Sequence, residues 1–263
     1  ELPKNLVNAA IAQADFNTYV RAIIISEQIT AALAASGRRV FCPDLPGRGA
    51  SDWLPDPALY QPPIYSQALA HLLARMDGPV DWVGTSLGGI CGMGIAATPG
   101  NAVRRMVLND IGAVIPASSL QRIRDYINLP APSFTDIAAL EAYLRDVHAP
   151  FGNLTDAEWR HLAETSARRD AEGVLRLHYD PAIIRAFSAG DVADIDLSPL
   201  WAAIAIPVLI LRGVASDVLP ADVAAQMARK PSAKLIEIAE AGHAPALMAA
   251  DQIAAIGNFL NAP

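Results

Sequence analysis

The sequence has only two cysteines among its 263 residues, Cys42 and Cys91, and neither belongs to a zinc-site pattern. The chain therefore cannot carry a disulfide framework, and a structural zinc is not expected. No run of about 18 apolar residues is free of charges and turn formers, which argues against a membrane span. Lysines and arginines form no cluster and the net charge is −7, so we do not expect a nucleic-acid partner.

Charged residues are also scarce, at 18%, whereas apolar residues make up 52% of the chain. This composition excludes a disordered protein and provides enough apolar side chains for a sizeable core. The start of the sequence has no signal-peptide pattern, because Lys4 is followed neither by a clean apolar stretch nor by a small-residue cleavage site. We therefore expect a cytoplasmic protein. The oligomeric state cannot be derived from these features.

Short apolar runs alternate with longer helical patterns along most of the chain. The apolar runs are 39–42, 80–83, 103–108, 207–212 and 234–239, and the helical patterns are 27–36, 65–76, 87–98, 221–230 and 251–261. Strands and helices that alternate at this spacing form βαβ units. The sequence thus predicts an α/β fold with a doubly wound, mostly parallel sheet.

One long segment departs from this alternation. Residues 116–198 contain four helical patterns and no convincing strand, and Thr155 with Glu158 forms a capping-box pattern at the start of one helix. We predict a core formed by residues 1–115 and 199–263, with residues 116–198 inserted as a helical lid. Such an insertion is expected above the carboxyl edge of the sheet, where open α/β sheets bind their ligands.

A candidate nucleophile lies between the second apolar run and the helical pattern that follows it. The five residues from Gly84 to Gly88 match G-x-S-x-G, with Ser86 at the centre. In a strand–turn–helix context, this pattern places the serine on a sharp turn that needs small neighbours and leaves a backbone N–H near the substrate. The alternative is a tight strand-to-helix turn without chemistry.

A serine hydroxyl needs a neighbouring base, and the base needs an acid that orients it. His243 stands between the last apolar run and the last helical pattern, so it should lie at the same edge of the sheet as Ser86. Two aspartates follow strands at that edge, Asp217 and Asp110, and both preserve the chain order Ser, Asp, His. We predict Asp217 as the acid and retain Asp110 as the alternative.

These segments resemble those of the α/β-hydrolase superfamily, and in particular bacterial serine hydrolases with a helical lid. The similar segments are 44–51, 84–89, 106–110, 207–213 with Asp217, and 242–245. The resemblance implies that Ser86 is the nucleophile, Asp217 the acid and His243 the base, and that the Leu87 amide is one oxyanion donor. The family's early His-Gly pair is absent from residues 1–40, so the second oxyanion donor is expected from the loop within residues 17–27.

Taken together, these features predict a serine hydrolase that cleaves small or medium carboxylic esters through an acyl-enzyme, with no cofactor and no metal. A small-molecule ester is the expected partner. Hydrolysis of a C–C bond, a lactone or an amide by the same three residues is the first alternative. A non-catalytic protein that binds a small ligand on this fold is the second, because a fold alone does not determine function.

Overall fold

The computed structural model describes residues 27–127, 132–188 and 191–262, and its centre is a parallel sheet. Four strands lie in the order β1-β2-β8-β9, and each neighbouring pair is parallel. They are β1 (Val80–Thr85), β2 (Val103–Asn109), β8 (Val208–Gly213) and β9 (Ala233–Ile238). The predicted mostly parallel α/β architecture is confirmed. No hydrogen-bonded ladder among the described residues includes the strand predicted at 39–42, which stays a prediction.

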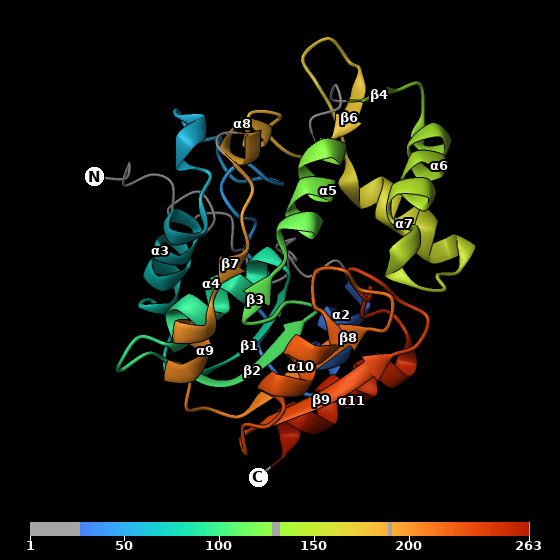
Figure 1. Ribbon diagram of the computed structural model, residues 1–263. Helices are drawn as coiled ribbons and strands as arrows, with labels where there is room; N and C mark the ends of the chain where they lie inside the picture. The colour runs from blue at the N-terminus through green and yellow to red at the C-terminus, as the bar shows by residue number, and fades with distance from the viewer. Residues whose placement is uncertain (1–26, 128–131, 189–190, 263) are drawn as a thin grey trace.

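Helices cover both faces of this sheet (Figure 1). Successive side chains of a strand point to opposite faces, so Met106 and Leu108 pack on one side and Val107 on the other. The first side is covered by α3 (Pro62–Leu73), α4 (Leu87–Ala96), α9 (Ser198–Ala203) and α10 (Ala221–Met227), and the second by α2 (Glu27–Ala35) and α11 (Ala250–Asn261). Burial on both faces explains why the central strands are nearly continuous apolar runs.

Residues 116–198, the predicted insertion and hereafter the inserted segment, contain helices and also small strands. Its helices are α5 (Ala117–Ile127), α6 (Ile137–Val147), α7 (Asp156–Ser166) and α8 (Ile183–Ser188), and the capping box predicted at the start of α7 is present. Three antiparallel strands lie in the order β4-β6-β5, namely β4 (Ser133–Phe134), β6 (Leu175–Leu177) and β5 (Ala167–Arg169). A further pair joins β3 (Val114–Ile115) to β7 (Ile195–Asp196). The expectation of no strand here is wrong, since strands of two or three residues show no alternation in sequence.

The inserted segment packs against the loop that connects β9 to α11. Buried apolar side chains of α6 and α7 form one cluster with Ala246 and Met248 of that loop. Two backbone hydrogen bonds reinforce the contact: the Gly242 amide donates to the Pro150 carbonyl at 2.7 Å, and the Ala246 amide donates to the Phe151 carbonyl at 3.2 Å. Residues of the inserted segment therefore hold both sides of His243.

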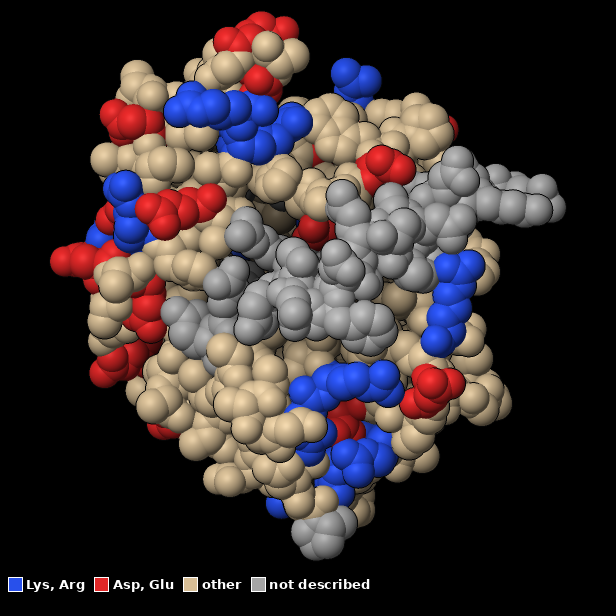
Figure 2. Space-filling view, turned by 180° about the vertical axis from the view of Figure 1, so that it is seen from behind, with Lys and Arg blue, Asp and Glu red and all other residues tan. Residues whose placement is uncertain are grey.

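The surface carries charges of both signs. On the face shown in Figure 2, basic and acidic side chains are interspersed on a mostly uncharged surface. One buried carboxylate of β1, Asp81, is neutralised by Arg38 and Arg104 at 2.6 and 2.7 Å. Among the described residues, no helix is long and apolar enough to cross a membrane.

Candidate active site

Ser86 occupies a sharp turn between the end of β1 and the start of α4. Its φ is +49°, in the region that non-glycine residues rarely adopt. The turn requires glycine nearby: a Cβ on Gly84 would lie 2.5 Å from the carbonyl oxygen of Gly88, and a Cβ on Gly89 would lie 2.3 Å from Ile111 Cγ2. The Ser86 amide donates to the Asn109 carbonyl at 3.1 Å, which ties the turn to the end of β2.

The Ser86 hydroxyl does not cap α4 but faces a histidine. Although Ser86 precedes the first residue of α4, its side chain bonds none of the helix amides. Its Oγ lies 3.0 Å from Nε2 of His243, which comes from the loop between β9 and α11. The other ring nitrogen, Nδ1, lies 2.8 Å from Oδ2 of Asp110, the residue that directly follows β2. Three residues from three separate loops thus form a continuous hydrogen-bonded chain.

This geometry determines which imidazole nitrogen carries the proton. An ionised carboxylate only accepts hydrogen bonds, so Nδ1 of His243 must donate to Asp110. Nε2 is then left as an acceptor, and it faces the Ser86 hydroxyl. The arrangement is the one in which a base can remove the hydroxyl proton.

The acid predicted from the sequence, Asp217, does not contact His243. Its carboxylate is 44% exposed and binds Arg122 of α5 through two hydrogen bonds of 2.6 and 2.8 Å. Burial alone would raise the pKa of Asp217, but the hydrogen bonds and charge of Arg122 outweigh it and hold that pKa below its ordinary value. The correction is that Asp110, the alternative, makes the contact with the imidazole.

The contact of His243 with Asp110 rather than with Asp217 has a simple structural cause. β2 and β8 are adjacent parallel strands, so the residues after them emerge side by side at one edge of the sheet. Asp110 leaves β2 with φ +55° and is completely buried beneath His243. Asp217 lies further along its own loop, where it binds the inserted segment instead. Sequence order is satisfied by both residues and therefore could not separate them.

The Asp110 carboxylate is surrounded by donors. The Gly213 amide donates to Oδ1 at 2.8 Å, and the Ser216 hydroxyl donates to Oδ2 at 2.5 Å, the same oxygen that binds His243. Gly213 has room only for hydrogen, because a Cβ there would lie 2.2 Å from the carbonyl oxygen of Gly242. Sequence reasoning missed both residues. The one feature of Gly213 and Ser216 that the sequence showed was their position between the apolar run 207–212 and Asp217.

Asn109 joins the turn that carries Ser86 to the loop that carries His243. It is completely buried, and its Nδ2 donates to Thr85 Oγ1 at 3.0 Å and to the Pro245 carbonyl at 2.8 Å. With its own carbonyl accepting from Ser86, this residue spans the three loops. The sequence marked Asn109 only as a strand end, since the pairing of its side chain depends on tertiary contacts.

The expected oxyanion donors are only partly within the described residues. Leu87 is the first residue of α4, so its amide is one of the helix N–H groups that have no carbonyl partner within the helix. It lies directly beside Ser86 and stays a predicted donor. The second donor was predicted within residues 17–27, a range that lies outside the described residues except for residue 27.

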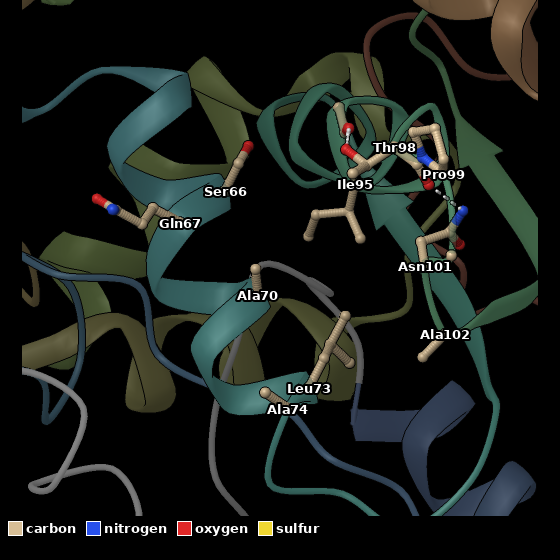
Figure 3. Close-up of a pocket in the computed structure, with 12 residues that line it drawn as sticks. Ser66, Gln67, Ala70, Leu73, Ala74, Ile95, Thr98, Pro99, Asn101 and Ala102 are labelled. Atoms are coloured by element: carbon tan, nitrogen blue, oxygen red, sulfur yellow. Dashed lines mark hydrogen bonds between the residues drawn. The ribbon is translucent and has the colours of Figure 1, made fainter.

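A groove lies at the far end of α4 and does not reach Ser86. It runs between α3 and the end of α4, and it is lined on one side by Ser66 and Leu73 and on the other by Thr98 and Asn101 (Figure 3). Gly94 and Ile95 near the end of α4 line it, so about eight residues of helix, or about 12 Å, separate it from the serine. This groove is therefore not the place where Ser86 would meet a substrate. Among the described residues, no group of three or more His, Cys, Asp or Glu side chains could hold a metal.

Comparison with known proteins supports the same family throughout the chain. The model of the alpha/beta hydrolase family matches residues 17–256. The chain is 38% identical to the 3-hydroxybutyrate-oligomer hydrolase of Cupriavidus necator, covering 84% of this chain and 78% of the relative. It is 29% identical to the 2-(acetamidomethylene)succinate hydrolase of Mesorhizobium japonicum, covering 83% and 77%. A solved α/β hydrolase from Novosphingobium aromaticivorans matches with a TM-score of 0.80 at 33% identity, covering 92% and 87%.

Proposed function

The chain belongs to the alpha/beta hydrolase family, and we propose that it is a serine hydrolase that cleaves small or medium carboxylic esters through an acyl-enzyme. The observation that carries the proposal is the hydrogen-bonded chain from Ser86 through His243 to Asp110. A nucleophile within reach of a base, which is itself oriented by a third group, is the arrangement that activates a hydroxyl. It also disfavours a purely ligand-binding role, which would not require this alignment.

In the first half of the proposed reaction, the Ser86 oxygen attacks the ester carbonyl carbon while Nε2 of His243 takes the hydroxyl proton. The negative charge that develops on the carbonyl oxygen is stabilised by the Leu87 amide and a second backbone donor. When the tetrahedral intermediate collapses, the C–O bond to the alcohol breaks. His243 gives its proton to the departing oxygen, which leaves an acyl group on Ser86.

The second half repeats these steps with water. His243 removes a proton from water, the resulting hydroxide attacks the acyl carbon, and the bond to Ser86 breaks as the serine regains its proton from His243. Asp110 stays ionised throughout. Its role is to keep the proton of neutral His243 on Nδ1 and to stabilise the imidazolium that forms twice in each cycle.

The similarity to a hydrolase of 3-hydroxybutyrate oligomers suggests natural substrates of the same kind. Units of a hydroxy acid joined into an oligomer are linked by ester bonds, which fits the proposed chemistry. The relative named for 2-(acetamidomethylene)succinate favours the second candidate, hydrolysis of an amide-type bond by the same three residues. Short hydroxybutyrate oligomers and an acylated amine substrate of similar size would separate the two candidates.

The experiment compares hydrolysis of p-nitrophenyl butyrate by the wild-type protein, Ser86→Ala and Ser66→Ala. Ser66 lies in α3 beside the groove at the far end of α4. Ser66→Ala is therefore the control, because it removes a serine hydroxyl away from the candidate active site. We expect Ser86→Ala to lose at least about 10³-fold in kcat and Ser66→Ala to keep most of it. A wild-type protein without turnover, or an active Ser86→Ala variant, would overturn the proposal.

A further inference from the structure

The buried carboxylate of Asp110 depends on a hydroxyl from another strand's loop. Ser216 follows β8, yet its Oγ lies 2.5 Å from Asp110 Oδ2, and both side chains are shielded from solvent. This oxygen of Asp110 also binds Nδ1 of His243 at 2.8 Å. The Ser216 hydroxyl and the imidazole therefore bind the same oxygen atom. A change in the hydrogen bond from Ser216 directly affects the hydrogen bond to His243.

The direction of the Ser216 hydrogen bond is determined by its other partners. Its oxygen accepts from the Val218 amide at 3.2 Å and from the Leu219 amide at 3.1 Å. A hydroxyl has two lone pairs and one proton, so two accepted hydrogen bonds leave the proton for Asp110. The two amides thus hold the hydroxyl in the orientation that donates to the carboxylate.

We propose that Ser216 is a positioning residue for the reaction, which holds the Asp110 carboxylate directed at His243. This inference rests on the proposed serine-hydrolase function. Asp110 is completely buried, and a buried carboxylate loses the solvation of its charge unless hydrogen bonds replace it. Its three donors are the Gly213 amide, the Ser216 hydroxyl and the His243 ring. Ser216 is the only donor of the three that can be removed without changing the backbone or the base.

Removal of this hydroxyl has a defined consequence for the pair formed by Asp110 and His243. With one donor fewer, the carboxylate is a stronger proton acceptor, so the pair holds its shared proton more tightly. The acid limb of the kcat/KM profile should then move to higher pH. The carboxylate would also lose part of its orientation, and we expect kcat to fall about 10- to 100-fold while KM changes less than about threefold.

A purely structural role for Ser216 makes a different prediction. Its bonds to the two amides also shape the loop after β8, and loss of those bonds alone would lower thermal stability without moving the pH profile. Ser216→Thr keeps the hydroxyl and should restore the wild-type profile. Ser119→Ala is the matched control, because the buried Ser119 hydroxyl binds the Asp217 carbonyl of the same loop at 2.5 Å but does not touch Asp110.

The test measures kcat, KM and thermal midpoint for the wild-type protein, Ser216→Ala, Ser216→Thr and Ser119→Ala between about pH 5 and pH 9. The inference predicts a shifted acid limb in Ser216→Ala alone. An unshifted limb in a folded Ser216→Ala variant would overturn it, as would an equal shift in Ser119→Ala.

A second measurement is independent of turnover. Proton NMR of the His243 ring reports the pH at which the imidazole titrates, with His243→Gln to assign the signal. Loss of the Ser216 hydroxyl should raise that pH whether or not an ester is hydrolysed, so a midpoint equal to the wild-type value would refute the positioning role. A wild-type protein that does not turn over esters, but in which the midpoint shifts, would overturn only the proposed function.

Discussion

Asp110→Asn should remove most of the hydrolytic activity, and the structure explains how. If the asparagine oxygen takes the place of Oδ1 and accepts from the Gly213 amide, its NH₂ group faces Nδ1 of His243. That group would donate to Nδ1 and force the ring proton to Nε2, where it blocks removal of the Ser86 proton. If the side chain is flipped, the NH₂ group meets the Gly213 amide, and two donors face each other in a buried site.

The size of the effect follows from the tautomer. The comparable aspartate-to-asparagine change in a serine protease lowers kcat by about 10⁴, or about 5.5 kcal/mol of transition-state stabilisation. Because the flipped arrangement is costly here as well, we expect a loss of about 10³ to 10⁴. Asp217 is different: its pair with Arg122 is 44% and 53% exposed, and such exposed pairs contribute about 0–1 kcal/mol. Because Asp110 and not Asp217 binds the imidazole, Asp217→Asn should change kcat by less than about fivefold.

The assay is kcat and KM for p-nitrophenyl butyrate with Asp110→Asn, Asp217→Asn and Asp125→Asn, each with a thermal midpoint to verify folding. Asp125 accepts a hydrogen bond from Gln121 on the exposed side of α5 and serves as the control aspartate. A larger loss of kcat in Asp217→Asn than in Asp110→Asn would refute the assignment of Asp110 as the acid. So would an Asp110→Asn variant that keeps more than about a tenth of the wild-type kcat.

Three further predictions concern stability. Gly213→Ala should destabilise the protein by about 1–3 kcal/mol, because its Cβ would lie 2.2 Å from the Gly242 carbonyl oxygen. Gly257→Ala in α11, where a Cβ would meet none of the described residues within 4 Å, should stabilise it by up to about 1 kcal/mol. Urea unfolding compares the two variants. Thr155→Ala removes the side-chain oxygen that accepts from the Glu158 amide at the start of α7, while the backbone amide of residue 155 can still donate to the Glu158 carboxylate. The loss should cost about 1 kcal/mol in the same measurement, whereas an unchanged midpoint would argue against the cap. Burial lowers the pKa of His148 from 6.5 to about 4, so between those values the unfolded chain binds a proton that the folded chain does not. Acid should therefore remove up to about 3 kcal/mol (2.5 × 1.36) of stability. His148→Phe keeps the stacking on Phe151 but has no group that titrates. Its free energy of unfolding should therefore fall less than that of the wild-type protein between neutral pH and about pH 4.5, and an equal fall would contradict the reasoning.

Much of the architecture was predictable because it depends on local patterns. The apolar runs at 80–83, 103–108, 207–212 and 234–239 became β1, β2, β8 and β9, since strands buried on both faces consist of consecutive apolar residues. The capping box at Thr155 was also visible, because both of its partners lie within three residues. The strands of the inserted segment were missed because each is only two or three residues long. β5 pairs with β6 across a short connection, and β4 pairs with β6 from the other side of α6 and α7.

The amino-acid sequence predicted the turn that carries Ser86, because glycines must flank a serine with positive φ between a strand and a helix. It also placed His243 at the same edge of the sheet. Which aspartate meets the imidazole depends on contacts between loops that are far apart in the chain. Asp110 and Asp217 follow neighbouring parallel strands, so their separation from His243 depends on how two loops fold, and burial beneath the ring selected Asp110 while Arg122 bound Asp217. The Ser216 hydroxyl was equally undetectable, because its partner lies 106 residues away in the chain.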